Sequence, residues 1–381
     1  MAAETSGSAG MPGIGEIVDA LEIGCNAADQ RQLFLILPGN HGPRWLIPAR
    51  PGAAASVLGA WRPYTPLSRM KWLALRMAEF TGWLRLAPAV STTTVSSAGV
   101  SRWLGRRGLE GPTGEMVVLV GNPSPDRKLI VFLLDEASRP AAVLKIGLTE
   151  GGGSSILHEA EVLGRLESCG YAAKVLSVDP DRRIAAQEYV QGAMPGRRFR
   201  NEYLDLLCRL PRSGSSRSLT VLAGEMASRL APFRDELERM LSGVLDRALD
   251  CLDCNATVAT VLAHKDFAPW NLRRHPRQGY VLVDWEWADF DGLPAYDLLH
   301  FHLNDERLFG GGAKVYAALR GGTTCAEYFR RLDLDPKLLP RLAIAYLLDQ
   351  LETDCDHRDA GNAAFTLRQL AAVLDAREFV P

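Results

Sequence analysis

Apolar residues alternate with polar ones, or run without interruption over a few positions, between residues 115 and 190. This pattern is typical of β-strands. A helical stripe with apolar residues three and four positions apart, from Ile156 to Leu166, interrupts the strands after the third. The predicted strands cover residues 116–120, 129–134, 142–146, 174–178 and 184–190. Residues 111–192 are therefore predicted to form a small lobe of five strands and one helix.

Beyond Gly192 the apolar residues recur at helical spacing. Helices are predicted over 202–210, 219–252, 342–351 and 363–377. The segment Ser213-Gly214-Ser215-Ser216 is predicted to link the first two, and a strand, a loop and a second strand are predicted between 258 and 287. Residues 193–381 are thus predicted to form a mainly helical lobe, and the chain is expected to be of the α+β class.

The N-terminal part of the chain follows a less regular pattern. Residues 1–15 are predicted to be a disordered tail, and residues 16–110 an N-terminal extension of unknown role with short strands at 33–37 and 45–48. A helix is predicted over 67–86, because Met70, Leu73, Met77, Phe80 and Leu84 fall on one helical face. Its basic residues are Arg69, Lys71, Arg76 and Arg85. This helix either packs on its own domain or lies on a membrane surface.

Composition narrows the class of protein. The 381 residues are 47% hydrophobic and 23% charged, which is typical of a globular protein. The formal net charge of −2 gives no general attraction to nucleic acid. The seven cysteines are an odd number and scattered, which favours reduced thiols. With neither a signal peptide nor a long apolar stretch, we expect a cytoplasmic protein without a transmembrane segment. The oligomeric state is left open.

The strongest chemical motif is His264-Lys265-Asp266-Phe267-Ala268-Pro269-Trp270-Asn271. A predicted strand, Tyr280-Val281-Leu282-Val283, then ends at Asp284. Phosphoryl transfer needs such a set of residues. One carboxylate orients the acceptor hydroxyl, while an amide oxygen and a second carboxylate hold Mg²⁺ on the nucleotide phosphates.

This motif resembles the catalytic loop of the aminoglycoside phosphotransferase and choline kinase family, which are relatives of protein kinases. The resemblance implies a bilobal protein-kinase-like fold, ATP or GTP as co-substrate and Mg²⁺ as cofactor. It assigns Asp266 as the catalytic base and Asn271 and Asp284 as metal ligands, with Lys145 contacting the phosphates and Glu159 pairing with Lys145.

The same resemblance covers the hinge and the loop supports. Gln187-Glu188-Tyr189-Val190-Gln191-Gly192 is similar to the segment that joins the two lobes and reads adenine, with Glu188 and Val190 as nucleotide-binding residues. Asp297 matches an aspartate that braces the catalytic loop, and His264 is expected to shape that loop by bonding its backbone. The match covers about residues 115–305.

The sequence departs from the family pattern at two places, of which the first favours the aminoglycoside branch over protein kinases and the second concerns the substrate. No G-x-G-x-x-G covers the first hairpin, which instead reads Gly121 to Lys128 with two prolines. Lys265 stands where the family usually has glycine, so it is expected to contact a phosphate or to alter the acceptor pocket. The resemblance implies an acceptor that is a hydroxyl-bearing small molecule, such as an aminoglycoside, an amino alcohol or a sugar. A cationic acceptor follows if a set of acidic residues faces the cleft, namely Asp289, Asp291, Asp305, Glu306, Asp349, Glu352, Asp354 and Asp356.

Other readings are weaker. A non-catalytic nucleotide-binding module, acting on a partner through the N-terminal extension, is the alternative function, but such proteins usually lose the base or a metal ligand. Cys251 and Cys254 lack a second pair at zinc spacing. His300 and His302 read as a strand-like pair on the surface or in the core, without a carboxylate partner.

Overall fold

The computed structural model describes residues 13–23, 26, 29–109, 115–310 and 315–376. By its internal contacts the chain divides into two compact units, each built from two separate segments. The first unit comprises Met1–Gly196 and Leu272–Glu286, and the second comprises Arg197–Asn271 and Trp287–Pro381. Of the predicted disordered tail, residues 1–12 lie outside the described part, while Ile14 and Gly15 begin a helix.

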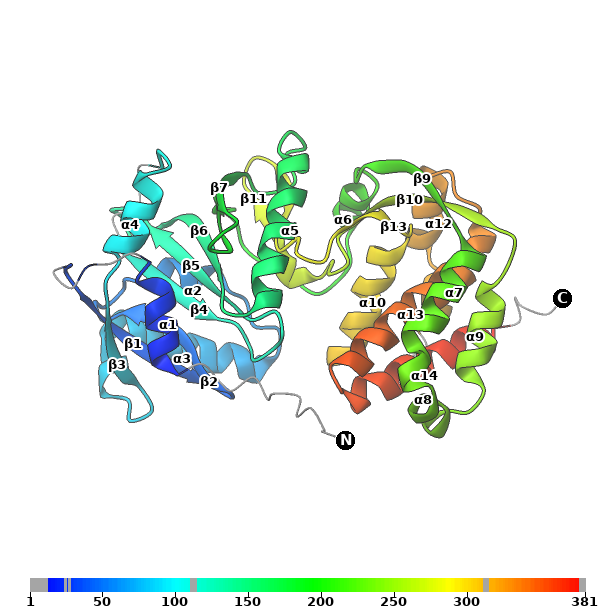
Figure 1. Cartoon of the computed structure of the whole chain (residues 1–381), viewed down its shortest axis with the longest axis horizontal. Helices are drawn as coiled ribbons and strands as arrows, with labels where there is room; N and C mark the ends of the chain where they lie inside the picture. Colours follow the sequence, from blue (N-terminus) through cyan, green and yellow to red (C-terminus); the bar gives the residue numbers. More distant parts are fainter. Residues whose placement is uncertain (1–12, 24–25, 27–28, 110–114, 311–314, 377–381) are drawn as a thin grey trace. The chain divides into compact units, whose positions relative to one another are not determined.

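An antiparallel sheet of eight strands forms the centre of the first unit (Figure 1). In spatial order the strands are β3 (Ser91–Val95), β1 (Gln32–Gly39), β2 (Gly42–Pro48), β4 (Met116–Val120), β5 (Lys128–Leu134), β6 (Pro140–Gly147), β8 (Ile184–Glu188) and β7 (Val175–Asp179). All five predicted strands are present, but the prediction of a five-stranded lobe is incomplete. The sheet continues into the N-terminal extension, because β2 pairs with β4 through Trp45–Leu119 and Leu46–Val118.

Alternating side chains of this sheet fill two cores, one on each face. One face is covered by α1 (Ile14–Leu21) and α4 (Ala98–Gly105), which contribute Ile17 and Trp103. The other is covered by α2 (Ala55–Ala60), α3 (Pro66–Thr81) and the 3-10 turn η1 (Trp83–Leu86), which contribute Leu58, Trp72 and Leu84. A hairpin of β11 (Leu272–His275) and β12 (Gly279–Leu282) also belongs to this unit.

Helix α5 (Glu150–Leu166) contains the three glycines that the sequence suggested were a flexible break. Its N-cap is Thr149, whose hydroxyl accepts from the Gly152 amide at 3.1 Å, rather than Ser154 or Ser155. A Cβ at Gly152 would collide with the carbonyl oxygen of Arg127. Gly151 and Gly152 are therefore needed because the helix backbone closely approaches residues 125–127, which lead into β5.

The second unit is mainly helical, as predicted. Its helices are α6 (Asn201–Leu207), α7 (Leu219–Leu230), α8 (Arg234–Met240), α9 (Val244–Leu252), α10 (Tyr296–Phe309), α11 (Val315–Arg320), α12 (Thr323–Arg331), α13 (Leu339–Asp356) and α14 (Ala360–Leu374). Short 3-10 turns are η2 (Ala231–Phe233), η3 (Pro269–Asn271) and η4 (Pro336–Leu338). Three antiparallel strands complete it, in the order β13 (Asp289–Gly292), β10 (Thr257–Ala263) and β9 (Arg212–Ser218). The α+β class is confirmed.

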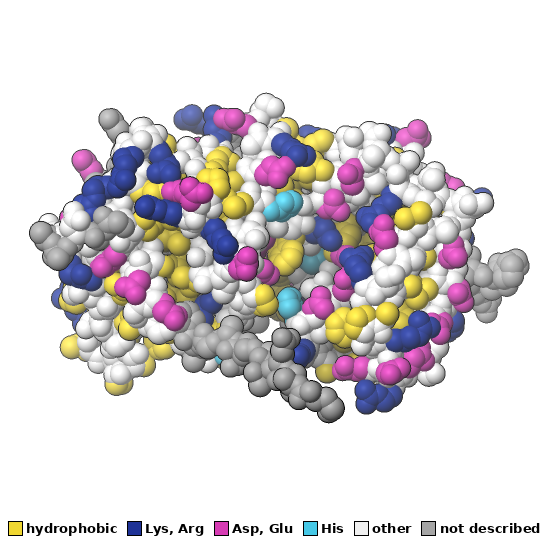
Figure 2. Space-filling view, in the orientation of Figure 1, with side chains coloured by type: hydrophobic (Ala, Val, Ile, Leu, Met, Phe, Trp, Pro, Cys, Tyr) yellow, Lys and Arg dark blue, Asp and Glu magenta, His cyan; other side chains and the backbone are white. Residues whose placement is uncertain are grey.

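Two predictions in this unit were wrong. Residues 212–218 are a strand rather than a linker, because their backbone pairs with β10. The single helix predicted over 219–252 is divided into three, with Pro232 in η2 and Gly243 in the left-handed region at φ 69°. On the face in view, Lys and Arg side chains are interspersed with Asp and Glu side chains, in keeping with the small net charge (Figure 2). In the described part, none of the helices is long and apolar enough to span a membrane.

Candidate active site

Lys145, Glu159 and Asp284 come together in the first unit. Lys145 lies on β6 between Ile130 of β5 and Ala185 of β8, and its Nζ is 2.6 Å from Glu159 Oε2 and 2.7 Å from Asp284 Oδ1. The predicted pairing of Lys145 with Glu159 is therefore present. Burial alone would lower the pKa of the Lys145 ammonium, but the carboxylates of Asp284 and Glu159 outweigh it and raise that pKa. Lys145 is thus a fixed cation.

A second lysine of this cluster was not predicted. Lys128, at the start of β5, is buried; its Nζ contacts the Glu286 carboxylate and lies 3.8 Å from Asp284 Oδ1. Burial holds the pKa of this ammonium below its ordinary value, although Asp284 acts in the opposite direction. Asp284 therefore lies close to two lysines. The available signal was a lysine opening an otherwise apolar strand, since buried lysines are rare without a partner.

Glu188 and Val190, the predicted hinge residues, line a cavity of about 430 Å³ in the first unit. Tyr189 and Arg277 line it too, and Lys145 does not. Glu188 ends β8 and its amide donates to the carbonyl of Lys174 at 2.8 Å. The structure thus places the hinge residues and the Lys145 cluster in the same unit without joining them in one cavity.

The loop predicted to be catalytic, residues 264–271, follows β10 in the second unit and ends in η3. Asp297, at the start of α10, accepts hydrogen bonds from the amides of His264 at 2.8 Å and Lys265 at 2.9 Å. Burial raises the pKa of the Asp297 carboxyl, and these two amides act in the opposite direction. His264 is fully buried, and its Nδ1 accepts from the Asp266 amide at 3.3 Å. Both residues therefore hold the backbone of the loop in shape.

Both carboxylate oxygens of Asp266 are engaged. Oδ2 accepts from Asn271 Nδ2 at 2.7 Å, and Oδ1 lies 3.2 Å from Nε2 of His300. On its other side, Nδ1 of His300 lies 3.3 Å from the hydroxyl of Tyr346. A His300 tautomer that carries its proton on Nε2 donates to Asp266 and accepts from Tyr346. The carboxylate is thus oriented by two side chains.

The interpretation of His300 from the sequence was wrong. It lies on a helix, α10, rather than on a strand, and its carboxylate partner is Asp266, which is 34 residues away in the sequence. No local spacing could have indicated that pair. His302 lies on the same helix; its Nε2 is buried and has no hydrogen-bond partner among the described residues, and burial lowers its pKa to about 4.

For the phosphoryl transfer that the sequence predicts, we expect His300→Leu to lower kcat by about tenfold, and KM for nucleotide to change little. A hydrogen bond to a charged group contributes about 1.5–3 kcal/mol, and its loss leaves Asp266 less well oriented. His300→Gln retains a donor and should recover most of kcat. His302→Leu removes an imidazole from the same helix and is the matched control. Steady-state kinetics on all three variants checks this, and equal kcat in His300→Leu and wild type would contradict it.

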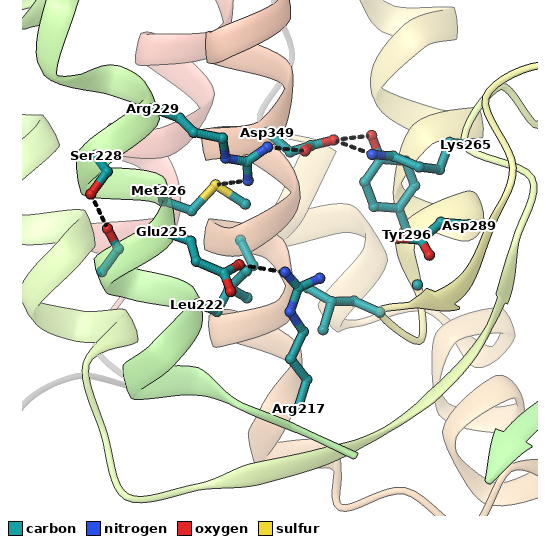
Figure 3. A pocket seen from close by; sticks show the side chains of 14 residues that line it. Arg217, Leu222, Glu225, Met226, Ser228, Arg229, Lys265, Asp289, Tyr296 and Asp349 are labelled. Carbon is teal, nitrogen blue, oxygen red and sulfur yellow. Dashed lines mark hydrogen bonds and ion pairs between the residues drawn. The ribbon is translucent and has the colours of Figure 1, made fainter. Parts of the chain in front are cut away.

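Lys265 has an unusual backbone for its residue type. Its φ of 63° is in the left-handed region, which favours glycine and costs other residues about 1 kcal/mol. The side chain reaches Asp349, with Nζ 3.0 Å from Oδ2, and lies over the ring of Tyr296 at 5.2 Å (Figure 3). The Tyr296 hydroxyl donates to the same Asp349 oxygen at 2.7 Å. Lys265 is therefore held in a fixed position immediately before Asp266.

These groups line a cavity of about 860 Å³ within the second unit (Figure 3). Its charged lining residues are Arg217, Arg229, Lys265, Glu225, Asp289 and Asp349. Arg217 pairs with Glu225, and Arg229 Nη1 lies 3.6 Å from Asp349 Oδ1. The cations and carboxylates are equal in number, so the cavity is polar without a strong net charge.

The acidic residues predicted to attract a cationic acceptor are largely neutralised by partners. Asp354 is buried, pairs with Arg307 at 3.3 Å and accepts from Thr366 at 2.7 Å. Asp305 pairs with Arg197 at 3.0 Å. Asp291 accepts from the hydroxyl of Ser215, and of the eight acidic residues only Asp289 and Asp349 line the 860 Å³ cavity. The acidic set therefore gives little reason for a cationic acceptor.

The described ranges give no support for a metal site of another kind, such as a zinc site. They hold no group of three His, Cys, Asp or Glu residues that could bind a metal ion. Cys251 and Cys254 are free thiols, as are the other four cysteines in the described part.

Comparison with known proteins shows the family to which the chain belongs. The family model described as "Phosphotransferase enzyme family" matches residues 129–334, which is more than half of the chain. No curated protein sequence is significantly similar. Among solved structures, the chain is similar to the aminoglycoside phosphotransferase APH(4)-Ia, with 14% identity over 75% of this chain and 100% of that one and a TM-score of 0.49.

Two further solved structures are similar to the same degree. The choline kinase LicA from Streptococcus pneumoniae is 14% identical over 72% of this chain and 97% of its own, with a TM-score of 0.45. A putative aminoglycoside phosphotransferase from Ralstonia eutropha JMP134 is 16% identical over 73% of this chain and 96% of its own, with a TM-score of 0.44. At such TM-scores the assignment rests on the family model.

The α+β fold and the pairing of a buried lysine with a helix glutamate are what the resemblance of the sequence to a phosphotransferase family implied. The chain belongs to the phosphotransferase enzyme family.

Proposed function

We propose that this protein transfers the γ-phosphate of ATP or GTP to a hydroxyl of a polar small molecule, with Mg²⁺ as cofactor. The observation that carries the proposal is the orientation of Asp266, whose two carboxylate oxygens are engaged by Asn271 and His300 in a loop braced by Asp297. A carboxylate fixed in this way suits a group that positions an acceptor hydroxyl and takes its proton.

Each remaining site residue has a role in this proposal. Lys145 contacts the nucleotide phosphates, Glu159 holds Lys145 in place, and Glu188 and Val190 contact the base. Asp284 and Asn271 ligate Mg²⁺, and their carboxylate and amide oxygens are ligands that this ion prefers. The Mg²⁺ ion neutralises charge on the phosphates when it is bound.

The donor chemistry around Asp284 fits the ion. Its side chain is 30% exposed, so it is accessible, and its Oδ1 lies 2.7 Å from Lys145 Nζ and 3.8 Å from Lys128 Nζ. Carboxylate oxygens are ligands that Mg²⁺ prefers, and an accessible side chain can present them to the ion. The two lysines also supply positive charge for phosphate groups.

We further propose that the acceptor binds in the 860 Å³ cavity that Lys265 lines. Such a volume suits a small molecule. Because the cations and carboxylates of the cavity are balanced, a neutral polyol or sugar, or an amino alcohol bound through its hydroxyls, fits better than a highly cationic compound. The free thiols are compatible with action in the cytoplasm.

The test is phosphoryl transfer from labelled Mg·ATP and Mg·GTP to a panel of sugars, polyols, amino alcohols and aminoglycosides. The proposal expects one class of hydroxyl compound to be phosphorylated in a Mg²⁺-dependent reaction. Turnover without Mg²⁺, or nucleotide binding without transfer to any class, would contradict it.

We expect Asp284→Asn to weaken Mg·ATP binding by more than about tenfold, or ~1.4 kcal/mol. The change removes a negative ligand from the metal and one of the carboxylates beside Lys145. Binding of ATP in the presence of EDTA should be much less affected. Isothermal titration with and without Mg²⁺ measures both. The control is Asp135→Asn, which alters a carboxylate of the same unit that bonds Arg139 and Ala137 in a turn. Unchanged Mg·ATP affinity in Asp284→Asn would show that Asp284 is not a ligand.

A further inference from the structure

The outward face of α3 and η1 is apolar. Seven large hydrophobic side chains between residues 67 and 86 are each 57–82% exposed, and they are Leu67, Met70, Leu73, Met77, Phe80, Trp83 and Leu86. They make up seven of the twelve exposed large hydrophobic side chains in the described part of the chain. Such a concentration on one element marks an interaction site, whereas single exposed hydrophobic residues are ordinary.

The helix has two apolar faces. The face toward the sheet consists of Trp72, Leu75 and Ala78, which pack into the core of the first unit. The spacing of Met70, Leu73, Met77 and Phe80 places these side chains on the opposite side. The stripe predicted from the sequence is therefore mostly the outward one, and only its last member, Leu84, is buried.

Basic residues border the outward face. Arg69 and Arg76 are seven positions apart, so they lie in one line along one border, and Lys71 lies on the other. Residues 61–90 contain five Lys or Arg residues and one acid, in a chain whose net charge is −2. None of the five cations forms an ion pair with any residue of the described ranges.

The one acid does not offset this charge. Glu79 is 3% exposed, and its Oε1 accepts from the amide of Ala54 at 3.0 Å. Burial raises the pKa of this carboxyl. The surface that α3 presents to solvent is therefore apolar in the middle and positive at its borders.

We propose that this face binds the surface of an anionic lipid bilayer. A helix with large apolar residues on one side and basic residues at the borders lies in the plane of the interface, with its apolar side among the acyl chains. Its 16 residues form a contact about 24 Å long. Self-association through the same face is less favourable, because a two-fold contact sets identical patches against each other and brings the basic borders together.

The test is co-sedimentation of the full chain with vesicles. Vesicles of phosphatidylcholine with about a quarter phosphatidylglycerol should bind at least about tenfold more protein than phosphatidylcholine alone, and binding should fall between about 0.1 M and 1 M salt. Met70→Glu with Met77→Glu should abolish binding. Lys71→Glu with Arg76→Glu should abolish the preference for anionic vesicles.

Leu308→Glu is the matched control, because Leu308 is exposed to a similar extent on α10, and it should bind as wild type does. Melting temperatures near that of wild type show that each variant is folded, and the two double variants test the proposal independently. Vesicle binding that does not depend on lipid charge, or that is unchanged in both double variants, would overturn the proposal. So would a wild-type protein that does not bind vesicles. So would a dimer in solution that Met70→Glu with Met77→Glu dissociates, since the partner would then be a second copy. The proposal is independent of phosphoryl transfer.

Discussion

Asp266→Asn is expected to lower kcat by roughly 10²–10⁴-fold, the usual effect of losing a general base, with Mg·ATP affinity within a few-fold of wild type. The asparagine oxygen can still accept from Asn271, but its amide nitrogen cannot accept from His300. The loss therefore combines reduced basicity with mispositioning. A loose transition state requires little proton removal before the phosphoryl group moves, so mispositioning contributes much of the effect.

Single-turnover transfer together with Mg·ATP titration separates these effects from a loss of binding. Asp246→Asn is a suitable control, because it changes an exposed carboxylate of the same unit, paired with Arg234, and exposed pairs contribute little to stability. Near wild-type turnover by Asp266→Asn on the true acceptor would remove the main support for the proposed function.

Removal of residues 1–110 is expected to yield a protein that does not fold. Of the twenty buried residues described in the core under α1 and α4, nine lie in that segment, including Ile17, Phe34 and Trp103. A large buried side chain contributes about 1.5–3 kcal/mol, whereas the net stability of a domain is about 5–15 kcal/mol. The deletion would also expose β4, whose five residues are all apolar, as an edge strand, which favours aggregation.

Expression of residues 111–381 beside the full chain, followed by size-exclusion chromatography and circular dichroism, measures this effect. The fragment should be insoluble or lack a cooperative thermal transition. A monomeric fragment with a cooperative thermal transition would contradict this prediction. It would show that residues 1–110 are an extension that the rest of the chain does not need for folding.

The sequence predicted those parts of the site whose residues follow in a fixed order along one motif. Asp266 and Asn271 are five residues apart in the loop motif, Asp297 matches an aspartate of the family pattern, and Lys145 and Glu159 fall on a strand and the next helix. His300 was missed because its pairing with Asp266 depends on how α10 packs against the loop. Lys128 was missed because its partners, Glu286 and Asp284, lie far from it in the sequence, beyond the whole of β6, α5 and the strands that follow.

The pattern of apolar residues along the chain left two features of the fold unpredicted. Strand β9 is rich in Ser and Arg and largely exposed, so no pattern of side chains indicated it; only backbone pairing with β10 makes it a strand. In α3 the periodicity was read correctly as a helical face. The periodicity could not show which of the two apolar faces of α3 packs on the sheet, because that depends on the core into which Trp72 and Leu75 pack.

The hairpin of β11 and β12 has a consequence for how such a protein can evolve. It packs in the first unit, where Ala193 bridges to Arg274 and Ala172 to Leu282, yet it is encoded between two segments of the second. Neither unit is therefore a contiguous stretch of the gene. A single recombination event between relatives cannot exchange one unit whole. An exchange that keeps the hairpin with its own sheet needs three crossovers, near residues 196, 271 and 286. Substitution of single residues therefore needs fewer events than exchange of a whole unit.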